Sequence, residues 1–309
     1  MRDMDVARRD FRAMGTTCSV LVYAAAGQAN ELARLGRLRV ELLEGAWSRF
    51  RDESELSRLN SLAGTGPVVV SPDTHALVSA MLEAWQATAG AFDPTVLAAM
   101  RAQGYDRDFS EVIVEQCLDV VASPAPGMHG VQIGEHTVSL PSGVGLDPGA
   151  IGKGLASDIV VEELRAAGAQ GVLVDLGGDM AFAGTPGADR TWRIGVVDER
   201  TRLGRNGGLE SEQWLDFPAG IAHAGVATST SLTRRWADAR HHVLDPGTGS
   251  STDERLVQAT VTGPRAWECE AWATAVLVRP ELTQSIPKDM TCLALGETSP
   301  GGLDETKVA

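Results

Sequence analysis

The chain has 309 residues, of which 43% are hydrophobic, so it is long enough to bury a large core. Its formal net charge is −14, from 41 acidic and 27 basic residues, and this excess repels phosphate backbones and anionic lipid surfaces. No apolar run approaches the roughly 18 residues of a membrane span, and the charged first residues lack the apolar core of a signal peptide. We therefore expect a cytoplasmic protein with no nucleic acid partner and no membrane insertion.

The first half of the chain alternates strand and helix patterns. Residues 17–23 form a β-branched and apolar run typical of a strand, and leucines at helical spacing predict a helix over residues 29–47. Residues 71–90 begin with Ser-Pro-Asp, continue with apolar residues at helical spacing and end with glycine, which predicts a second helix. Short strand patterns at residues 131–134 and 137–140 are separated by turn residues, as in a hairpin.

The second half adds a helix pattern over residues 151–168 and a strand–turn–strand pattern over residues 171–184. Residues 198–212 are polar and contain glycines, so we predict a mobile excursion without a chemical role, and we predict disorder for the tail, 296–309. Hairpins together with helices favour an α+β fold with mixed sheets and flanking helices over a doubly wound parallel sheet. We expect one domain over residues 1–295.

The four cysteines are spread along the chain, at Cys18, Cys117, Cys269 and Cys292, and no two of them form a CxxC pair. Such spacing argues against a structural zinc site and against a disulfide framework. We predict that all four are reduced thiols packed within the protein.

A glycine-rich turn within residues 146–160, LDPGAIGKGLASDIV, holds an acid and a lysine at the start of a predicted helix. Helix N-termini present unpaired N–H groups, and glycines let the backbone approach a phosphate closely, so Asp147 and Lys153 mark a candidate anion site. The P-loop pattern requires glycine at position 147 and serine or threonine at position 154, where this chain has Asp147 and Gly154. Alternatively, the turn is only structural and its lysine lies in solvent.

Further short motifs follow in order along the chain: FRAMGTT (11–17), WSRFRDESELSRLN (47–60), GAFDPTV (90–96), VLVDLGGDM (172–180), GVATSTSLTRRW (225–236), HHVLDPGTG (241–249) and CEAWATA (269–275). Together with the glycine-rich turn, this ordered set resembles the FAD:protein FMN transferase family, the ApbE-type flavin transferases, over residues 11–295. The resemblance implies a bilobal, T-fold-like architecture with the active site between the lobes. It also implies an enzyme that binds FAD and Mg²⁺, cleaves the FAD pyrophosphate, attaches FMN through a phosphoester to a threonine or serine of an acceptor flavoprotein, and releases AMP.

Two oxygen-bearing side chains lie one helical turn apart in the last motif. Glu270 and Thr274 are at i and i+4 of a helical segment, so the carboxylate and the hydroxyl project from one face, and Mg²⁺ prefers such hard oxygen ligands. By the resemblance they bind the metal together with the backbone carbonyl of Ala150, although the family more often has aspartate in place of Glu270. This assignment requires that the helix meet the turn around Lys153 at a hollow. Alternatively, Glu270 is a surface side chain and Thr274 bonds to its own backbone.

The resemblance assigns a further set of residues to FAD: Met14, Phe50, Ala91, Phe92, Asp93, Asp147, Lys153 and Leu244. The isoalloxazine ring needs an apolar slot with a few polar contacts, which the first five of these can supply. Asp147 would accept hydrogen bonds from the nucleotide, Lys153 would offset phosphate charge, and the backbone of Leu244 would meet the cofactor. Alternatively, Met14 and Phe92 are ordinary core residues.

Proton transfer has two neighbouring candidates, His241 and His242, because histidine titrates near neutrality and can act as a general base. In a strand the two side chains would face opposite sides. The family's recurrent histidine corresponds to His242, and the alternative is a structural histidine bonded to nearby backbone. Thr230 stands where the family commonly has glycine, and its side chain could crowd the acceptor channel.

Three functions remain open at this point. The first is Mg²⁺-dependent transfer of FMN to an acceptor protein. The second is an FAD pyrophosphatase, in which water replaces the acceptor hydroxyl and FMN and AMP are released. The third is a flavin-binding protein without turnover. The products formed from FAD in the presence of a candidate acceptor protein distinguish the three functions.

Overall fold

The computed structural model describes residues 4–107, 123–187, 190–202, 212–236, 240–253 and 255–296. Most of the predicted disordered tail, residues 203–211 of the polar segment, and Cys117 lie outside these ranges. Within them, Cys18, Cys269 and Cys292 are buried free thiols, as predicted. In the same ranges no helix combines the length and the apolar character needed to cross a bilayer.

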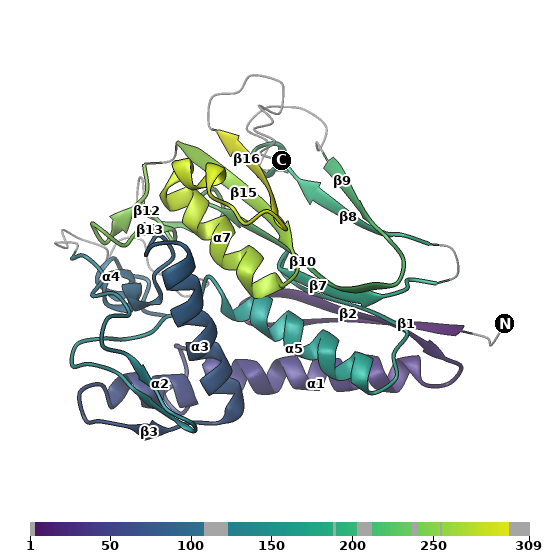
Figure 1. Ribbon diagram of the computed structural model, residues 1–309, viewed down its shortest axis with the longest axis horizontal. Coiled ribbons are helices and arrows are strands. Elements are labelled where there is room, and N and C mark those ends of the chain that lie inside the picture. Colours follow the sequence, from purple (N-terminus) through teal and green to yellow (C-terminus); the bar gives the residue numbers. More distant parts are fainter. Residues whose placement is uncertain are drawn as a thin grey trace.

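A seven-stranded sheet forms the main layer of the fold (Figure 1). Its strands, in spatial order, are β1 (Met4–Ala13), β2 (Thr16–Ala25), β6 (Gly171–Leu176), β7 (Met180–Gly184), β10 (Ile221–Thr230), β15 (Leu256–Gly263) and β16 (Thr291–Gly296). Each described pairing between neighbours is antiparallel, which is more uniform than the mixed sheets expected. Successive side chains of a strand point to opposite faces, so Val20 and Val22 of β2 join one core and Leu21 and Tyr23 join another.

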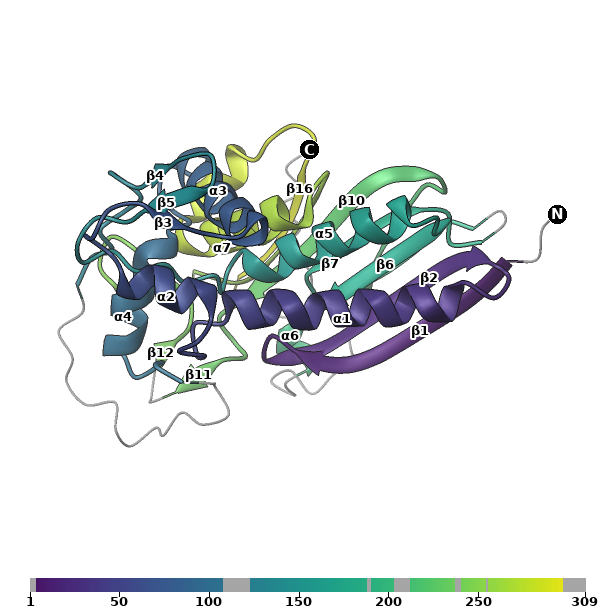
Figure 2. The same cartoon turned by 90° about the horizontal axis from the view of Figure 1, so that it is seen from below.

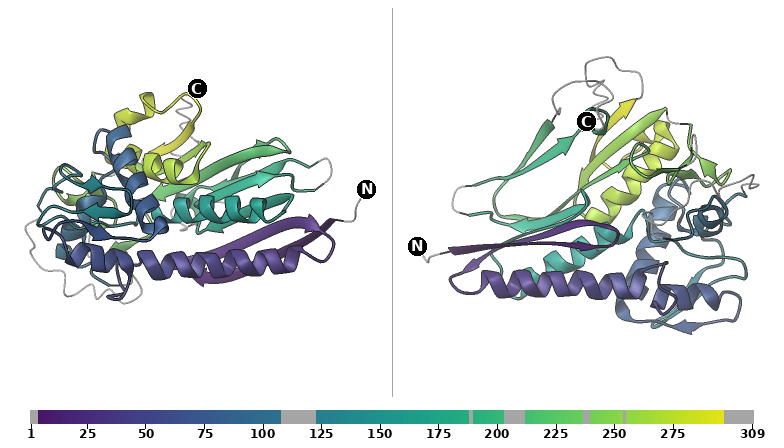
Figure 3. Two further views of the ribbon diagram at one scale, coloured as in Figure 1. Left: turned by 60° about the horizontal axis from the view of Figure 1, so that its bottom comes forward. Right: turned by 180° about the vertical axis from the view of Figure 1, so that it is seen from behind.

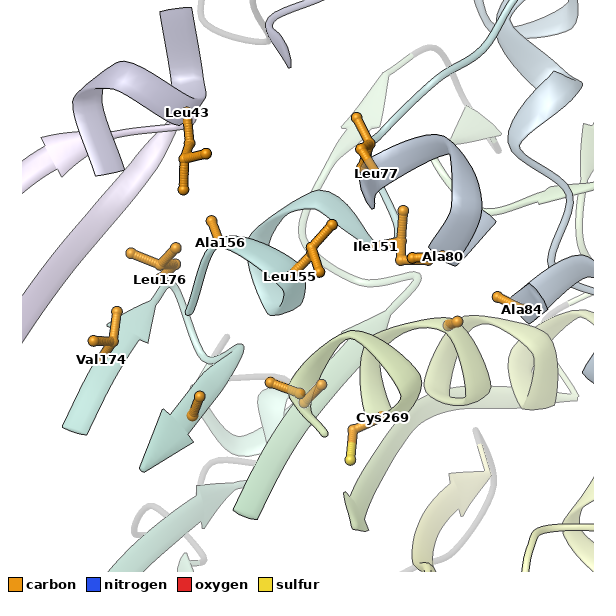
Figure 4. Close-up of a cluster of buried hydrophobic side chains, with 14 of the residues drawn as sticks. Leu43, Leu77, Ala80, Ala84, Ile151, Leu155, Ala156, Val174, Leu176 and Cys269 are labelled. Carbon is orange, nitrogen blue, oxygen red and sulfur yellow. The ribbon is translucent and has the colours of Figure 1, made fainter. Parts of the chain in front are cut away.

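Three helices cover one face of this sheet: α1 (Ala29–Trp47), α5 (Gly152–Ala166) and α7 (Ala266–Val278). Figure 2 shows α1 and α5 running side by side along the strands. The core between the layers is continuous, and Figure 4 shows Leu43 of α1 and Leu155 of α5 within it. Burial of apolar area across this interface is the main favourable term that holds the helices in place.

The opposite face of the sheet is covered by a hairpin of β8 (Trp192–Val197) and β9 (Glu212–Phe217). Phe182 of β7 is fully buried there, and its ring centroid lies 4.9 Å from that of Phe217 and 5.7 Å from that of Trp192. Such tilted and edge-on contacts are favourable geometries for aromatic pairs. The hairpin therefore closes the second core and brings residues of β8 toward one end of the sheet.

A smaller lobe lies at one end of α1 (Figure 3, left). Its elements are α2 (Glu55–Ser61), β3 (Val68–Val69), α3 (Pro72–Ala87), η1 (Pro94–Val96), α4 (Leu97–Ala102), β4 (Gln132–Ile133) and β5 (Thr137–Ser139). The predicted hairpin is confirmed as the antiparallel pair of β4 and β5, to which β3 adds a third strand. Ser71 caps α3 by accepting from the Thr74 N–H, so the helix begins where its Ser-Pro-Asp signal predicts.

The remaining short elements run between or beside the two lobes. They are α6 (Glu199–Arg202), β11 (Arg235–Trp236), β12 (Arg240–His241), β13 (Leu244–Asp245), β14 (Ser250–Ser251) and η4 (Pro280–Gln284). Trp236 and Leu244 pack on Met100 and Tyr105, which joins β11 and β13 to the smaller lobe. The strand expected through HHVLDP is interrupted, because β12 ends at His241 and β13 begins at Leu244.

The α+β fold with flanking helices is confirmed, whereas the prediction for residues 198–212 is wrong for its first residues. Asp198 and Arg200 form a buried ion pair at 2.8 Å, and Arg200 Nη1 also donates to the Gly296 carbonyl at 2.7 Å. These contacts hold α6 against the end of β16. A polar composition predicted exposure, but paired charges can be buried when their hydrogen bonds are satisfied.

Candidate active site

A cavity of about 800 Å³ is lined by residues of the smaller lobe and of the elements around the large sheet. The residues that the resemblance assigned to FAD, to the metal and to proton transfer all line it: Met14, Phe50, Ala91, Phe92, Asp93, Asp147, Ala150, Lys153, His242, Leu244, Glu270 and Thr274. These residues come from the start of α5, from α7, from the smaller lobe and from the strands between them. The fold thus brings together residues spread over almost the whole chain.

The backbone of the glycine-rich turn before α5 is held by hydrogen bonds to the smaller lobe. Asn60 of α2 donates its amide Nδ2 to the Leu146 carbonyl at 2.9 Å and accepts from the Leu146 N–H at 2.8 Å. The Asp147 N–H donates to the Pro94 carbonyl at 2.7 Å, and Asp147 Oδ1 accepts from the Gly149 N–H at 2.7 Å. The turn therefore enters α5 in one fixed conformation, with the first residues of the helix against the cavity.

The contact expected between this turn and the last motif is present. Lys153 Nζ lies 2.5 Å from Glu270 Oε1 and also donates to Asp179 Oδ2, and the Gly154 N–H donates to Glu270 Oε2 at 2.7 Å. Gly154 is in the first turn of α5, where N–H groups lack helical partners, so the Glu270 carboxylate satisfies one of them. The contacts of Lys153 with Glu270 and Asp179 exclude the alternative that this lysine lies in solvent.

Glu270 is only 2% exposed, which excludes the alternative that it is a surface side chain. Asp179 is also 2% exposed, so two buried carboxylates share one ammonium group. Burial and the neighbouring Asp179 raise the pKa of Glu270, and Lys153 offsets only part of that effect. Burial alone would lower the pKa of Lys153, but the two carboxylates outweigh it and raise the pKa, so the lysine stays charged.

α5 and α7 meet so closely that only glycine fits at the crossing. A Cβ built on Gly154 would lie 2.5 Å from the Ala266 carbonyl oxygen, which is backbone and cannot rotate away. We predict that Gly154→Ala lowers the free energy of unfolding by about 2 kcal/mol or more, because the helices must separate and Glu270 loses its N–H partner. Urea denaturation measures this change.

The matched control is Gly45→Ala in α1, where the nearest atom to the added Cβ is 3.9 Å away. Alanine is the better helix former, so this variant should keep or slightly raise stability. If Gly154→Ala and Gly45→Ala have the same unfolding free energy, the close crossing of α5 and α7 does not constrain the site.

Thr274 lies one turn after Glu270 and lines the same cavity, as the i and i+4 spacing predicts. Its Oγ1 is 2.9 Å from Ser229 Oγ of β10. Thr230 also lines the cavity, but its Oγ1 donates to the Val257 carbonyl at 2.8 Å and accepts from the Leu232 N–H at 3.1 Å. The hydroxyl of Thr230 is thereby bonded to the backbone of β15 and of the segment that follows β10.

The candidate flavin slot has an apolar wall and one buried acid. Phe92 is 2% exposed and belongs to the main core, as the alternative considered for it states, and it also lines the cavity. Asp93 Oδ1 accepts from the N–H and the hydroxyl of Thr95 at 2.8 and 2.6 Å, while burial raises the pKa of its carboxyl. Met14 has a left-handed backbone, φ 49°, and its N–H donates to Glu44 Oε1 at 2.7 Å.

The comparisons with known proteins agree with this geometry. The ApbE family profile matches residues 14–289. The chain belongs to the ApbE family. The resemblance inferred from the ordered motifs is therefore confirmed. Two curated ApbE relatives are named FAD:protein FMN transferase. The one from Treponema pallidum is 30% identical over 285 residues, covering 86% of this chain and 76% of the relative. The one from Klebsiella pneumoniae is 26% identical over 292 residues, covering 91% and 81%.

Solved ApbE structures share the fold. The flavin transferase ApbE from Vibrio cholerae superposes with a TM-score of 0.75 at 20% identity and covers 96% of each chain. The apo flavinyl transferase ApbE from Pseudomonas stutzeri gives a TM-score of 0.77 at 20% identity, covering 96% of this chain and 93% of that one. This likeness concerns the fold, and it places the α+β architecture of the present chain among the ApbE proteins.

His242 and His241 have different surroundings in this ApbE chain. His241 is fully buried, whereas His242 lines the cavity. Burial, together with the nearby Arg234 and His241, lowers the pKa of His242 to about 3, so its imidazole is neutral at ordinary pH. Its Nδ1 is buried and has no hydrogen-bond partner among the residues that the structure describes.

The sequence patterns did not single out several other charged residues that line this cavity, among them Arg49, Asp179 and Glu199. Arg49 Nε lies 3.0 Å from Asp147 Oδ2, and its guanidinium stacks over the rings of Phe50 and Tyr105 at 4.2 and 4.5 Å. Arg49 and Asp179 both lie within the ordered motifs. Arg49 stands beside an aromatic residue and Asp179 directly follows Gly-Gly, and these two patterns were the available sequence signals. Glu199 lay in a segment assigned no chemistry.

Proposed function

We propose that this protein is an Mg²⁺-dependent FAD:protein FMN transferase, which joins FMN through a phosphoester to a threonine or serine of an acceptor protein and releases AMP. The observation that carries the proposal is the contact of Lys153 with Glu270, which are 117 positions apart. It places a helix N-terminus, a lysine and buried acids on one cavity, whose volume of about 800 Å³ suits a dinucleotide. Membership of the ApbE family supports the same chemistry.

The residues around Lys153 fit a magnesium ion. Two buried carboxylates that share one ammonium group leave a net negative charge, and Thr274 adds a hydroxyl oxygen on the same cavity. Carboxylate, hydroxyl and carbonyl oxygens are the ligands that Mg²⁺ takes together with substrate phosphate. We assign the metal to Glu270, Thr274 and the carbonyl of Ala150. When bound there, the metal would neutralise charge on the diphosphate.

The FAD diphosphate would bind at the N-terminus of α5, where the helix dipole and Lys153 both favour an anion. The flavin would occupy the slot formed by Met14, Phe50 and residues 91–93, close to the backbone of Leu244. Asp147 would accept hydrogen bonds from the nucleotide, and the ion pair with Arg49 would hold the Asp147 carboxylate in position. Each of these groups is already ordered by hydrogen bonds or packing, so little reorganisation is needed when FAD binds.

In the transfer step, the acceptor hydroxyl oxygen forms a bond to the phosphorus on the FMN side of the diphosphate, and the bond from that phosphorus to the AMP oxygen breaks. The hydroxyl proton goes to the neutral imidazole of His242, which lines the cavity. An approaching diphosphate would raise the pKa of this histidine, because a nearby negative charge stabilises the imidazolium. The base would then be stronger in the substrate complex than in the free protein.

The test is incubation with FAD, Mg²⁺ and a candidate acceptor protein, followed by mass spectrometry of the acceptor and chromatography of the nucleotides. A mass gain of one FMN on a threonine or serine, with AMP in solution, supports transfer. Free FMN and AMP without that gain would indicate a pyrophosphatase instead, and unchanged FAD would indicate binding without turnover.

We predict that Lys153→Ala weakens FAD binding by about 10-fold or more and weakens riboflavin binding much less, because a charged hydrogen bond to phosphate contributes about 1.5–3 kcal/mol. Flavin fluorescence titrations measure both affinities. Lys288→Ala is the matched control, since this lysine is exposed and lies outside the cavity. Equal losses for FAD and riboflavin would place Lys153 away from the phosphates.

A further inference from the structure

Lys153 occupies an unusual place, because its ammonium group lies between two buried carboxylates at the point where both face the cavity. Nζ is 2.5 Å from Glu270 Oε1 and also contacts Asp179 Oδ2. The lysine side chain is 18% exposed, compared with 3% for Asp179 and 2% for Glu270. All three residues line the cavity, and the lysine between the two acids is the most exposed of them.

Each carboxylate is anchored through its other oxygen. Glu270 Oε2 accepts from the Gly154 N–H at 2.7 Å, and Asp179 Oδ1 accepts from the Thr228 N–H at 3.3 Å. The Ser157 hydroxyl also donates to the Asp179 carbonyl at 3.1 Å. Because backbone groups of α5 and β10 hold the two acids, their free oxygens would stay directed at the same point if the ammonium left.

We propose that Lys153 is a built-in counter-ion, which fills the divalent-cation position between Asp179 and Glu270 until the FAD diphosphate draws it away. The inference rests on the proposed function and adds Asp179 to the residues facing the metal. Lysine and a divalent cation cannot share this position, since two positive charges so close together in a buried site repel strongly. A diphosphate at the N-terminus of α5 offers Lys153 another anionic partner and also adds phosphate oxygens for the metal.

The consequence is a positive coupling between FAD and the metal. Without FAD, a metal ion must displace Lys153 from both acids, so its affinity is low. With FAD bound, Lys153 has a new partner and the two anchored oxygens become available. Coupling is reciprocal, so the metal must strengthen FAD binding by the same factor.

The experiment is titration of Mn²⁺, followed by electron paramagnetic resonance of the free ion, with the wild-type protein and Lys153→Met. We expect the variant to bind Mn²⁺ about 10-fold or more tighter than the wild type in the absence of flavin, within the usual range of coupling factors. Lys288→Met, which removes an exposed charge of the same kind, should bind like the wild type. Unchanged or weaker Mn²⁺ binding by a folded Lys153→Met overturns the inference.

A second measurement uses the wild-type protein alone, so it does not depend on whether a variant folds. Mn²⁺ affinity is compared in the presence of FAD and of riboflavin, which lacks the diphosphate, and chromatography checks that FAD stays intact. We expect FAD to tighten Mn²⁺ binding by about 10-fold or more and riboflavin to leave it unchanged. Equal affinities with both ligands overturn the inference.

The two proposals fail in different ways. If Mn²⁺ binds neither protein even when FAD is present, the metal site of the proposed function is wrong, and the lysine inference falls with it. If Mn²⁺ binds the wild type tightly without flavin and Lys153→Met leaves that affinity unchanged, only the lysine inference is wrong. Neither result depends on observing transfer to an acceptor.

Discussion

Glu270→Gln is expected to lower the rate of FMN transfer by about 10³-fold or more at saturating FAD. The substitution removes a charged oxygen that we assign to the metal, and metal stabilisation of the transition state contributes several kcal/mol. The measurement is the rate of flavin attachment to the acceptor over a range of Mg²⁺ concentrations. Glu270→Asp keeps the charge on an arm one methylene shorter, so it should retain more activity than the glutamine variant.

The control for this variant is Glu268→Gln, which changes an acid two positions away on α7 that does not line the cavity. It should transfer FMN at the wild-type rate. Glu270→Gln should remain folded, because its amide oxygen can still accept from the Gly154 N–H and Lys153 retains Asp179 as a partner. A folded Glu270→Gln protein with normal Mg²⁺-dependent activity would remove Glu270 from the metal site.

His242→Ala is expected to lower kcat for FMN transfer by about 10²–10⁴-fold, the usual contribution of a general base, with little change in the affinity for FAD. Added imidazole should restore part of the rate, because the cavity left by the side chain can admit it. His136→Ala changes an exposed histidine outside the cavity and should behave like the wild type. A loss of FAD affinity without a change in kcat would give His242 a binding role instead.

The pH dependence of folding gives an independent check on the same histidine. Its pKa is lowered to about 3 in the folded protein from an ordinary value near 6.5, so the unfolded chain binds more protons between those values. The buried neutral form therefore contributes stability that is present above pH 6.5 and is lost as the pH falls toward 3. Unfolding free energies of His242→Ala should fall less steeply over that interval than those of the wild type.

The periodic elements of this fold could be predicted from the sequence because their apolar positions repeat with a recognisable period. The helix over residues 29–47 and the β6–β7 hairpin within residues 171–184 are examples. α7 was harder to interpret, since it is buried between the sheet, α3 and α5 and is apolar on nearly all sides. An acid within such a helix has no sequence signal for burial, which is why a surface position for Glu270 stayed open as an alternative.

The residues of the candidate site could be predicted from the ordered motifs, but most of the side chains that contact them in the fold could not. The resemblance implied that Glu270 meets the turn around Lys153, but nothing in the chain near Lys153 indicates that Asp179 will approach it too, because that depends on how α5 lies beside β7. The role of Arg49 could not be predicted for the same reason. It depends on an ion pair with Asp147, 3.0 Å in length, which forms only when the chain folds. Tertiary distances of this kind are set by packing across the whole core.

The turn that precedes α5 is fastened on two sides, by Asn60 of the smaller lobe and, through Gly154 and Glu270, by the helix that lies on the large sheet. A movement of one lobe relative to the other would strain both sets of hydrogen bonds. It would distort the nucleotide-binding turn before either lobe unfolded. We therefore expect activity to be lost at temperatures below the melting transition. A tightly bound dinucleotide, which contacts both lobes, should raise the temperature at which this loss occurs.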